Sequence, residues 1–193
     1  EPSSIKAVVL SHAHIDHSGN LPGLVKQGFR GPIYCTPATK SLCEVMLKDS
    51  AFIQEKDAEY VNKKHGRKGK PPVEPLYTEE DVNQTVPLLQ GREYGKTFDV
   101  LEGITCRFED AGHILGSAAV ALTLRENSHS CSLAFTGDLG KDFGDKMAVE
   151  FQKMDAARVR TALAWDDVRL YARALGLAEV QWLHERQTTG CGW

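Results

Sequence analysis

The residues best suited to chemistry lie close together in the segment Ser11-His12-Ala13-His14-Ile15-Asp16-His17. Three imidazoles and one carboxylate occur within these seven residues, and both are ligand types that zinc prefers. Protonating all three rings would place like charges side by side, whereas a bound metal holds them neutral. The alternative is a polar loop in which the histidines only cap or hydrogen-bond, which would suit a single histidine better. The cluster therefore predicts a metal site.

The apolar run 5–10 directly precedes this cluster and predicts a buried strand. The cluster would then lie in the loop at the carboxyl end of the strand, where α/β layers usually place chemistry. His12 and His14 are two residues apart, so in an extended loop they can point to the same side and bind one ion. Asp16 and His17 lie beyond the turn and could face a second ion. Such a double set suits two metals about 3.5–4 Å apart, which need ligands on both flanks.

Two later predicted strands end in residues of the same kind. Gly112-His113 follows the strand 104–109, and Thr136-Gly137-Asp138 follows the strand 132–135. A single histidine or aspartate after a strand, such as His113 or Asp138, is typical of a turn or capping residue. Because both follow apolar strands, as His12 does, they could converge on one edge of a layered sheet, with glycine allowing close backbone approach.

The other predicted elements alternate between helices and strands. A short helix is predicted at 20–25, a strand at 31–35, and a helix from Pro37 to about Ser50 that continues through 62. The run Thr78-Glu79-Glu80-Asp81 resembles a capping box that opens a helix ending near Leu89. Further strands are predicted at 97–101 and 119–124.

The run His12-Ala13-His14-Ile15-Asp16-His17 resembles the H-x-H-x-D-H signature of the metallo-β-lactamase superfamily of metallohydrolases. This resemblance implies a layered α/β fold, an incomplete αββα sandwich. It also implies that His12, His14 and His113 hold one zinc ion. Asp16 and His17 would hold a second zinc ion, and Asp138 would bridge the two.

The segments 11–22 and 110–118 are similar to the β-CASP branch of this superfamily, whose members process nucleic acids. The segment 72–82 is similar to the bacterial exonuclease-type members of that branch. The resemblance spans 5–142 and implies an RNA-directed phosphodiesterase, exo- and endonucleolytic, with single-stranded RNA as its substrate. The sequence leaves open which RNA is cut and whether manganese replaces the two zinc ions.

The predicted mechanism follows from these ligands. Two zinc ions would lower the pKa of a shared water towards 7 and neutralise the charge that builds up on the phosphodiester. The superfamily pattern implies that Asp16 is both a ligand and the acceptor of the water's proton, which makes it the predicted catalytic residue. Two other interpretations stay open. One is a hydrolase of small esters, lactones or β-lactams, and the other is an inactive metal-binding fragment.

Composition sets the class of protein. The 193 residues carry a formal net charge of −3 and are 41% hydrophobic, which is ordinary for one globular domain. No run approaches the ~20 apolar residues of a membrane span, and a signal-peptide pattern is not found. The cysteines are odd in number and lack C-x-x-C pairing, so we expect a reducing cytoplasm and core positions rather than metal ligands. They are Cys35, Cys43, Cys106, Cys131 and Cys191.

Residues 1–145 are predicted to form a partial metallo-β-lactamase-like domain, because strands that usually precede the metal loop and the β-CASP insertion are not found. Residues 146–193 are predicted to be a helical tail of unclear origin, since 147–176 has the pattern of one or two amphipathic helices. His184 is the candidate there for a last metal ligand, whereas His129 is expected to be exposed. An exposed sheet edge would favour pairing into a homo-oligomer.

The basic residues concentrate in one run, 63–70, followed by Pro71-Pro72. This run could neutralise the phosphates of RNA, and the RNA hypothesis requires it to lie beside the metal site. The alternative, which the sequence alone favours, is a solvated loop. His65 belongs to this run and is not expected to be a ligand.

Overall fold

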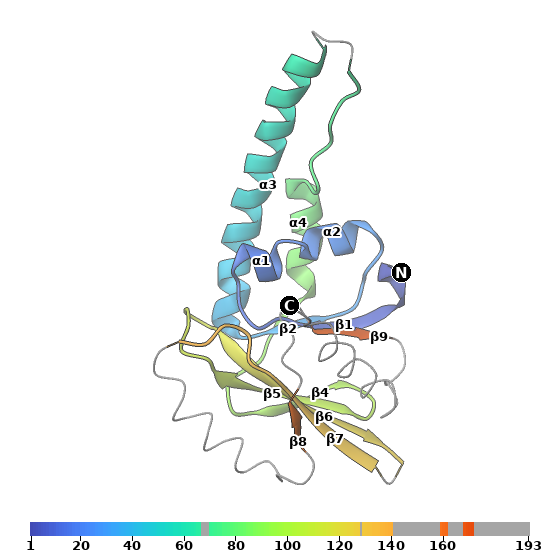
Figure 1. Ribbon diagram of the computed structural model, residues 1–193, viewed down its shortest axis with the longest axis vertical. Coiled ribbons are helices and arrows are strands. Elements are labelled where there is room, and N and C mark those ends of the chain that lie inside the picture. Colours follow the sequence, from blue (N-terminus) through green and yellow to red (C-terminus); the bar gives the residue numbers. More distant parts are fainter. Residues whose placement is uncertain (67–69, 128, 141–158, 162–167, 172–193) are drawn as a thin grey trace, which may run out of the picture.

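The computed structural model describes residues 1–66, 70–127, 129–140, 159–161 and 168–171. Within them, helices cover one face of a first β-sheet, and the other face of that sheet packs against a second β-sheet (Figure 1). This order of layers confirms the predicted layered α/β fold class, with three layers of the αββα sandwich in the described residues.

The first sheet contains, in order, β3 (Leu89–Gly91), β2 (Ile33–Cys35), β1 (Ile5–Val9) and β9 (Val168–Tyr171). β1 pairs with β2, and β2 with β3, in parallel, whereas β9 is antiparallel to β1. Parallel neighbours need crossover connections, which helices usually supply. The carboxyl ends of β1 and β2 therefore lie at the same edge of the sheet.

The second sheet contains, in order, β4 (Thr97–Leu101), β5 (Ile104–Asp110), β6 (Ala118–Glu126), β7 (His129–Phe135) and β8 (Val159–Thr161). The strands β4 to β7 are antiparallel to their neighbours, and β8 is parallel to β7. Because β5 and β7 both run antiparallel to β6, their carboxyl ends also meet at one edge.

The helical segments are η1 (Pro2–Ser4), α1 (Ile15–Ser18), α2 (Leu21–Lys26), α3 (Pro37–Gly66), α4 (Glu79–Thr85) and η2 (Val86–Leu88). The helix predicted from Pro37 through 62 is confirmed as α3, which is 30 residues long and extends to Gly66. The capping box at α4 is confirmed: the Thr78 hydroxyl accepts from the Asp81 N–H, and the Asp81 carboxylate accepts from the Thr78 N–H. α4 ends at Thr85 rather than near Leu89, since the next residues form η2 and then pair as β3.

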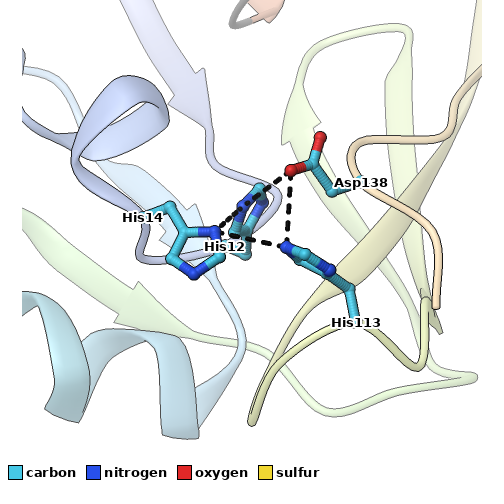
Figure 2. Close-up of side chains that lie close together, drawn as sticks. All are labelled: His12, His14, His113 and Asp138. Atoms are coloured by element: carbon cyan, nitrogen blue, oxygen red, sulfur yellow. Dashed lines mark hydrogen bonds and ion pairs between the residues drawn. The ribbon is translucent and has the colours of Figure 1, made fainter.

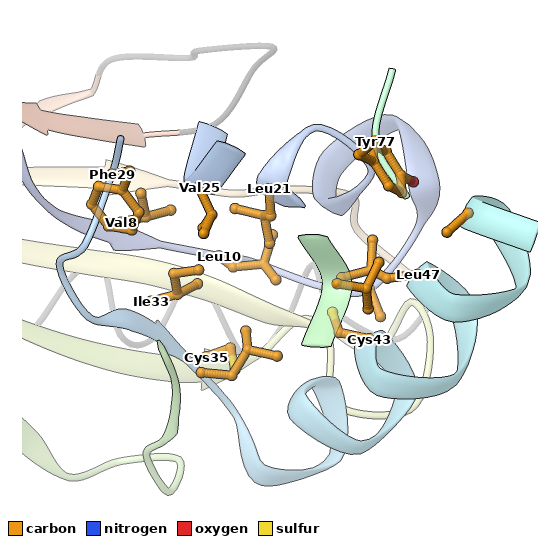
Figure 3. Close-up of a cluster of buried hydrophobic side chains, with 14 of the residues drawn as sticks. Val8, Leu10, Leu21, Val25, Phe29, Ile33, Cys35, Cys43, Leu47 and Tyr77 are labelled. Atoms are coloured by element: carbon orange, nitrogen blue, oxygen red, sulfur yellow. The ribbon is translucent and has the colours of Figure 1, made fainter. Parts of the chain in front are cut away.

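β1 is the centre of the core because its side chains alternate between two apolar clusters. Val8 lies in the cluster beneath the helices, with Phe29, Leu47 and Tyr77 (Figure 3). Ala7 and Val9 lie in the cluster between the two sheets. Burial on both faces explains why the run from Ile5 to Val9 is apolar almost throughout.

The prediction of a helical tail is wrong at two segments, because residues 159–161 and 168–171 are the strands β8 and β9. Both contain β-prone residue types, valine with threonine in β8 and valine with tyrosine in β9, and each pairs with an edge of an existing sheet. The other residues of 146–193, with His184 and Cys191 among them, lie outside the described residues.

Searched over the described residues, the helices include none that is both long and apolar enough to cross a membrane.

We predict that Cys35, Cys43 and Cys106 do not react with iodoacetamide in the folded protein at mildly alkaline pH. Burial raises the pKa of each of these thiols to about 12, which suppresses the reactive thiolate. Peptide mass spectrometry should find them unmodified before denaturation and fully modified in guanidinium chloride. Rapid modification of these thiols in the folded chain would contradict the described core.

Candidate metal centre

Three loops at one edge of the paired sheets bring three histidines and an aspartate together (Figure 2). His12 and His14 follow β1, His113 follows β5, and Asp138 follows β7. These loops come from both sheets and meet because the carboxyl ends of β1, β5 and β7 lie at the same edge. The convergence that sequence reasoning proposed for these three strand ends is therefore what the structure shows.

The facing atoms of the four residues lie at contact distance. His14 Nδ1 is 3.1 Å from His12 Nε2 and 3.2 Å from His113 Nε2. Asp138 Oδ2 is 3.4 Å from His113 Nε2 and 3.7 Å from His12 Nε2. Ligands at 2.0–2.1 Å from a tetrahedral zinc ion are about 3.3 Å apart. The distances above, 3.1–3.7 Å, are close to this value, and all four atoms lie within 4.8 Å of one another. The donor set therefore has the chemistry for one tetrahedral cation and a spacing close to the one that it requires.

His12 is buried, and its ring is held in the neutral form. The pKa of His12 is lowered to about 4, mainly by burial and next by the nearby His17 ring, while the Asp138 carboxylate opposes the shift. The Ser11 hydroxyl lies 3.1 Å from His12 Nδ1, so that side of the ring has a partner within the protein. His12 Nε2 therefore faces the other three groups as a neutral donor, as a metal ligand requires.

Asp16 and His17 lie on α1, beside the compact group rather than within it. His17 Nε2 is 3.6 Å from Asp138 Oδ1 and 3.7 Å from Asp16 Oδ2. Asp138 accordingly directs one oxygen towards the histidines of the group and the other towards His17. The Asp16 side chain is 78% exposed, so it faces solvent beside the group.

The loop that carries His113 is held by hydrogen bonds within the loop and from Tyr94. The Ser117 hydroxyl accepts from the N–H groups of His113 and Ile114, both at 3.1 Å. The Tyr94 hydroxyl donates to the Ser117 carbonyl oxygen at 2.8 Å. Sequence reasoning did not identify Ser117 or Tyr94, since only the folded loop brings them to the His113 backbone.

The same loop is anchored to the start of α3 through Gly116. The hydroxyls of Thr36 and Thr39 donate to the Gly116 carbonyl oxygen at 2.7 and 2.8 Å. Gly116 has a φ of +82°, and a Cβ there would lie 2.6 Å from the Thr39 nitrogen. Only glycine combines this left-handed conformation with so close an approach.

The described part of the basic run does not lie beside the metal centre. Its described part includes Lys63 and Lys64 in the last turn of α3, whereas the first turn of α3 contacts the His113 loop. A helix of 30 residues is about 45 Å long. The sequence analysis predicted this helix through 62, but it could not show that the far end of the helix projects beyond the sheets (Figure 1).

The remaining described histidines are not part of the centre. His65 lies near the end of α3, with Nδ1 3.1 Å from the Pro71 carbonyl oxygen. His129 begins β7 and is exposed. Neither joins the group of metal-ligating side chains found in the described part of the chain.

Residues 1–176 match the family model of the metallo-beta-lactamase superfamily. Because the match covers most of the chain, the chain belongs to this superfamily, as the H-x-H-x-D-H pattern predicted. A B3 metallo-beta-lactamase with an active-site glutamic acid aligns with a TM-score of 0.46 and 12% identity, covering 98% of this chain and 70% of that chain.

Two similar proteins act in transcription or on RNA, judged by their names. Transcription termination factor FttA from Methanocaldococcus jannaschii is 31% identical over 168 residues, covering 85% of this chain and 24% of that protein. A ribonuclease from Thermus thermophilus is 34% identical over 140 residues, covering 72% of this chain and 27% of that protein. This chain therefore spans about a quarter of each relative's length. Both names agree with the nucleic-acid-processing branch that the sequence resembles.

We predict that Gly116→Ala weakens both the fold and zinc binding, whereas Gly95→Ala affects only the fold. Both glycines have positive φ, but a Cβ at Gly95 would meet nothing within 4 Å. The control, Gly95→Ala, should lower the free energy of unfolding by about 1 kcal/mol, because of the left-handed conformation alone. Gly116→Ala should lower the free energy of unfolding by clearly more, because the His113 loop must move away from Thr39. Chemical denaturation and zinc titration would measure both effects, and equal results for the two variants would contradict the anchoring role.

Proposed function

We propose that this chain carries the active site of a metal-dependent hydrolase that cleaves phosphodiester bonds of single-stranded RNA and uses two zinc ions. The observation that carries the proposal is the set of four donor atoms of His12, His14, His113 and Asp138, at mutual distances that suit a tetrahedral ion. The ribonuclease and the termination factor among the relatives support RNA as the substrate class. Because the chain spans a quarter of those relatives, the activity of the whole protein is part of the proposal.

The residues divide into two ligand sets that share Asp138. His12, His14 and His113 would hold the first ion together with Asp138 Oδ2. Asp16 and His17 would hold the second with Asp138 Oδ1, the oxygen that lies 3.6 Å from His17. Three imidazoles in the first set favour zinc over manganese, which prefers oxygen donors.

Bound zinc would supply a water that loses its proton near neutral pH and a positive charge facing the phosphodiester. Asp16 would accept the proton of the attacking water, for which its exposed carboxylate beside the four donor residues is suitably placed. Asp138 would fix the separation of the two ligand sets through its two oxygens. Ser11 would keep the His12 ring oriented, and Ser117 would fix the backbone at His113.

We predict that the purified chain binds two zinc ions and cleaves a fluorescent single-stranded RNA, and that His12→Ala abolishes cleavage and lowers the zinc content. His129→Ala is the matched control, because it removes an exposed histidine away from the centre. Metal analysis and a gel assay would measure both properties. About one zinc per chain without cleavage would overturn the proposal in favour of an inactive metal-binding protein. Turnover of a small ester without RNA cleavage would also overturn it.

We predict that Asp16→Asn lowers the rate of RNA cleavage about 10²- to 10⁴-fold while zinc still binds to the first ligand set. The amide keeps the shape of the side chain but accepts a proton poorly. The thermal unfolding temperature should stay unchanged, since Asp16 is exposed. Asp57→Asn on the exposed surface of α3 is the control. An unchanged cleavage rate in Asp16→Asn would exclude Asp16 as the proton acceptor.

A further inference from the structure

Helix α3 has a buried side and an exposed apolar side. Cys43, Leu47, Ala51 and Ala58 face the core, and the segment after α3 reaches the helix through Asn62 and Val73. Figure 1 shows α3 projecting beyond the sheets for much of its length. Large apolar side chains with more than half of their surface exposed also lie on this helix. They are Val45 (67%), Phe52 (55%), Ile53 (51%) and Tyr60 (59%).

These apolar side chains share one face with two charged residues. Positions spaced by three or four residues line the same side of a helix. Val45, Asp49, Phe52, Lys56 and Tyr60 follow this spacing, and Ile53 borders them. We call this set of six residues the α3 stripe. All six are exposed.

We propose that the α3 stripe is the surface on which two copies of this chain associate, with the two α3 helices antiparallel. The stripe is complementary to itself under a two-fold axis that passes between Phe52 and Ile53. In this arrangement Val45 packs against Tyr60 of the second copy, and Phe52 packs against Ile53 of the second copy. Asp49 faces Lys56 of the second copy, and Lys56 faces its Asp49. Apolar layers therefore alternate with layers of opposite charge.

The positions of Asp49 and Lys56 favour the antiparallel arrangement over a parallel one. Asp49 and Lys56 are seven residues apart on one helix, about 10 Å along the axis, so they do not pair within a copy. In a parallel arrangement each would face its own equivalent, and like charges would repel. In the antiparallel arrangement each meets the opposite charge. Within one copy, Lys56 Nζ lies 3.0 Å from Glu59 and 5.7 Å from the Phe52 ring centroid, so its side chain already lies over the stripe.

The size of the stripe sets the strength of the association. A stable interface usually buries about 800 Å² on each partner, which is more than a few helical turns provide. The dimer is therefore weak and depends on protein concentration. The stripe lies on the exposed side of α3 and runs away from the end of the helix that contacts the His113 loop, so the association leaves the metal centre open to solvent in both copies.

Charge reversal on the full chain tests this arrangement, with sedimentation equilibrium as the measurement. The wild-type chain should associate reversibly into dimers as its concentration rises. D49K places Lys beside Lys56 of the second copy, and K56D places Asp beside Asp49. Each should raise the dimer dissociation constant about tenfold, because two such contacts occur in each dimer. D57K, an exposed reversal outside the stripe, is the control and should leave association unchanged.

Two further samples separate pairing from general disruption of the helix. An equimolar mixture of D49K and K56D should form a heterodimer, because every contact across the two-fold axis is then between opposite charges. The double variant D49K/K56D should regain the wild-type association. A wild-type chain that stays monomeric at all concentrations would overturn the proposal. Single variants that associate like the wild type, or a mixture that stays monomeric, would also overturn it.

Discussion

The constraint on which the structure depends is the crowding of His12 Nε2, His14 Nδ1, His113 Nε2 and Asp138 Oδ2 around one point. Ring nitrogens at 3.1 and 3.2 Å from one another are close enough to share a hydrogen bond or to bind one cation between them. Such an arrangement is favourable when a cation occupies that space, and it is costly when the rings are protonated together. Burial of His12 disfavours its protonated form, which agrees with a site that holds a cation.

The two sheets are tied together at the edge where this crowding occurs. The Ala118 N–H, at the start of β6, donates to the Ser11 carbonyl oxygen at 2.8 Å. The Gly140 N–H, beyond Asp138, donates to the Ala111 carbonyl oxygen at 2.9 Å. The loops that carry the donors are thus bonded directly to one another. The backbone fixes the positions of the four side chains before any ion binds, which lowers the cost of organising the site.

The sequence predicted much of this centre because the information is local. An H-x-H-x-D-H run after an apolar strand, and a histidine and an aspartate that each follow another strand, are visible in the residue order. The support of the His113 loop is not local: Thr36 and Thr39 lie 80 and 77 residues from Gly116 in the chain. Two ordinary threonines at a helix start carry no pattern that indicates such a partner.

The errors of the sequence analysis also arise from tertiary structure. The distance between the described part of the basic run and the metal centre follows from the direction of α3, whose far end projects beyond the sheets, and residue patterns do not show where a helix end lies relative to another loop. The strands β8 and β9 lie in the segment 147–176, for which the amphipathic pattern predicts helix, whereas pairing with the edges of the two sheets favours the extended form. Fold class and superfamily were predictable because they depend on the strand order and on the metal loop.

The most direct test of the central claim is an anomalous difference map from a crystal of this chain grown with zinc and measured at the zinc absorption edge. The account predicts a peak within about 2.0–2.2 Å of His12 Nε2, His14 Nδ1, His113 Nε2 and Asp138 Oδ2. A zinc ion held elsewhere on the chain, with these four side chains turned away from one another, would contradict it.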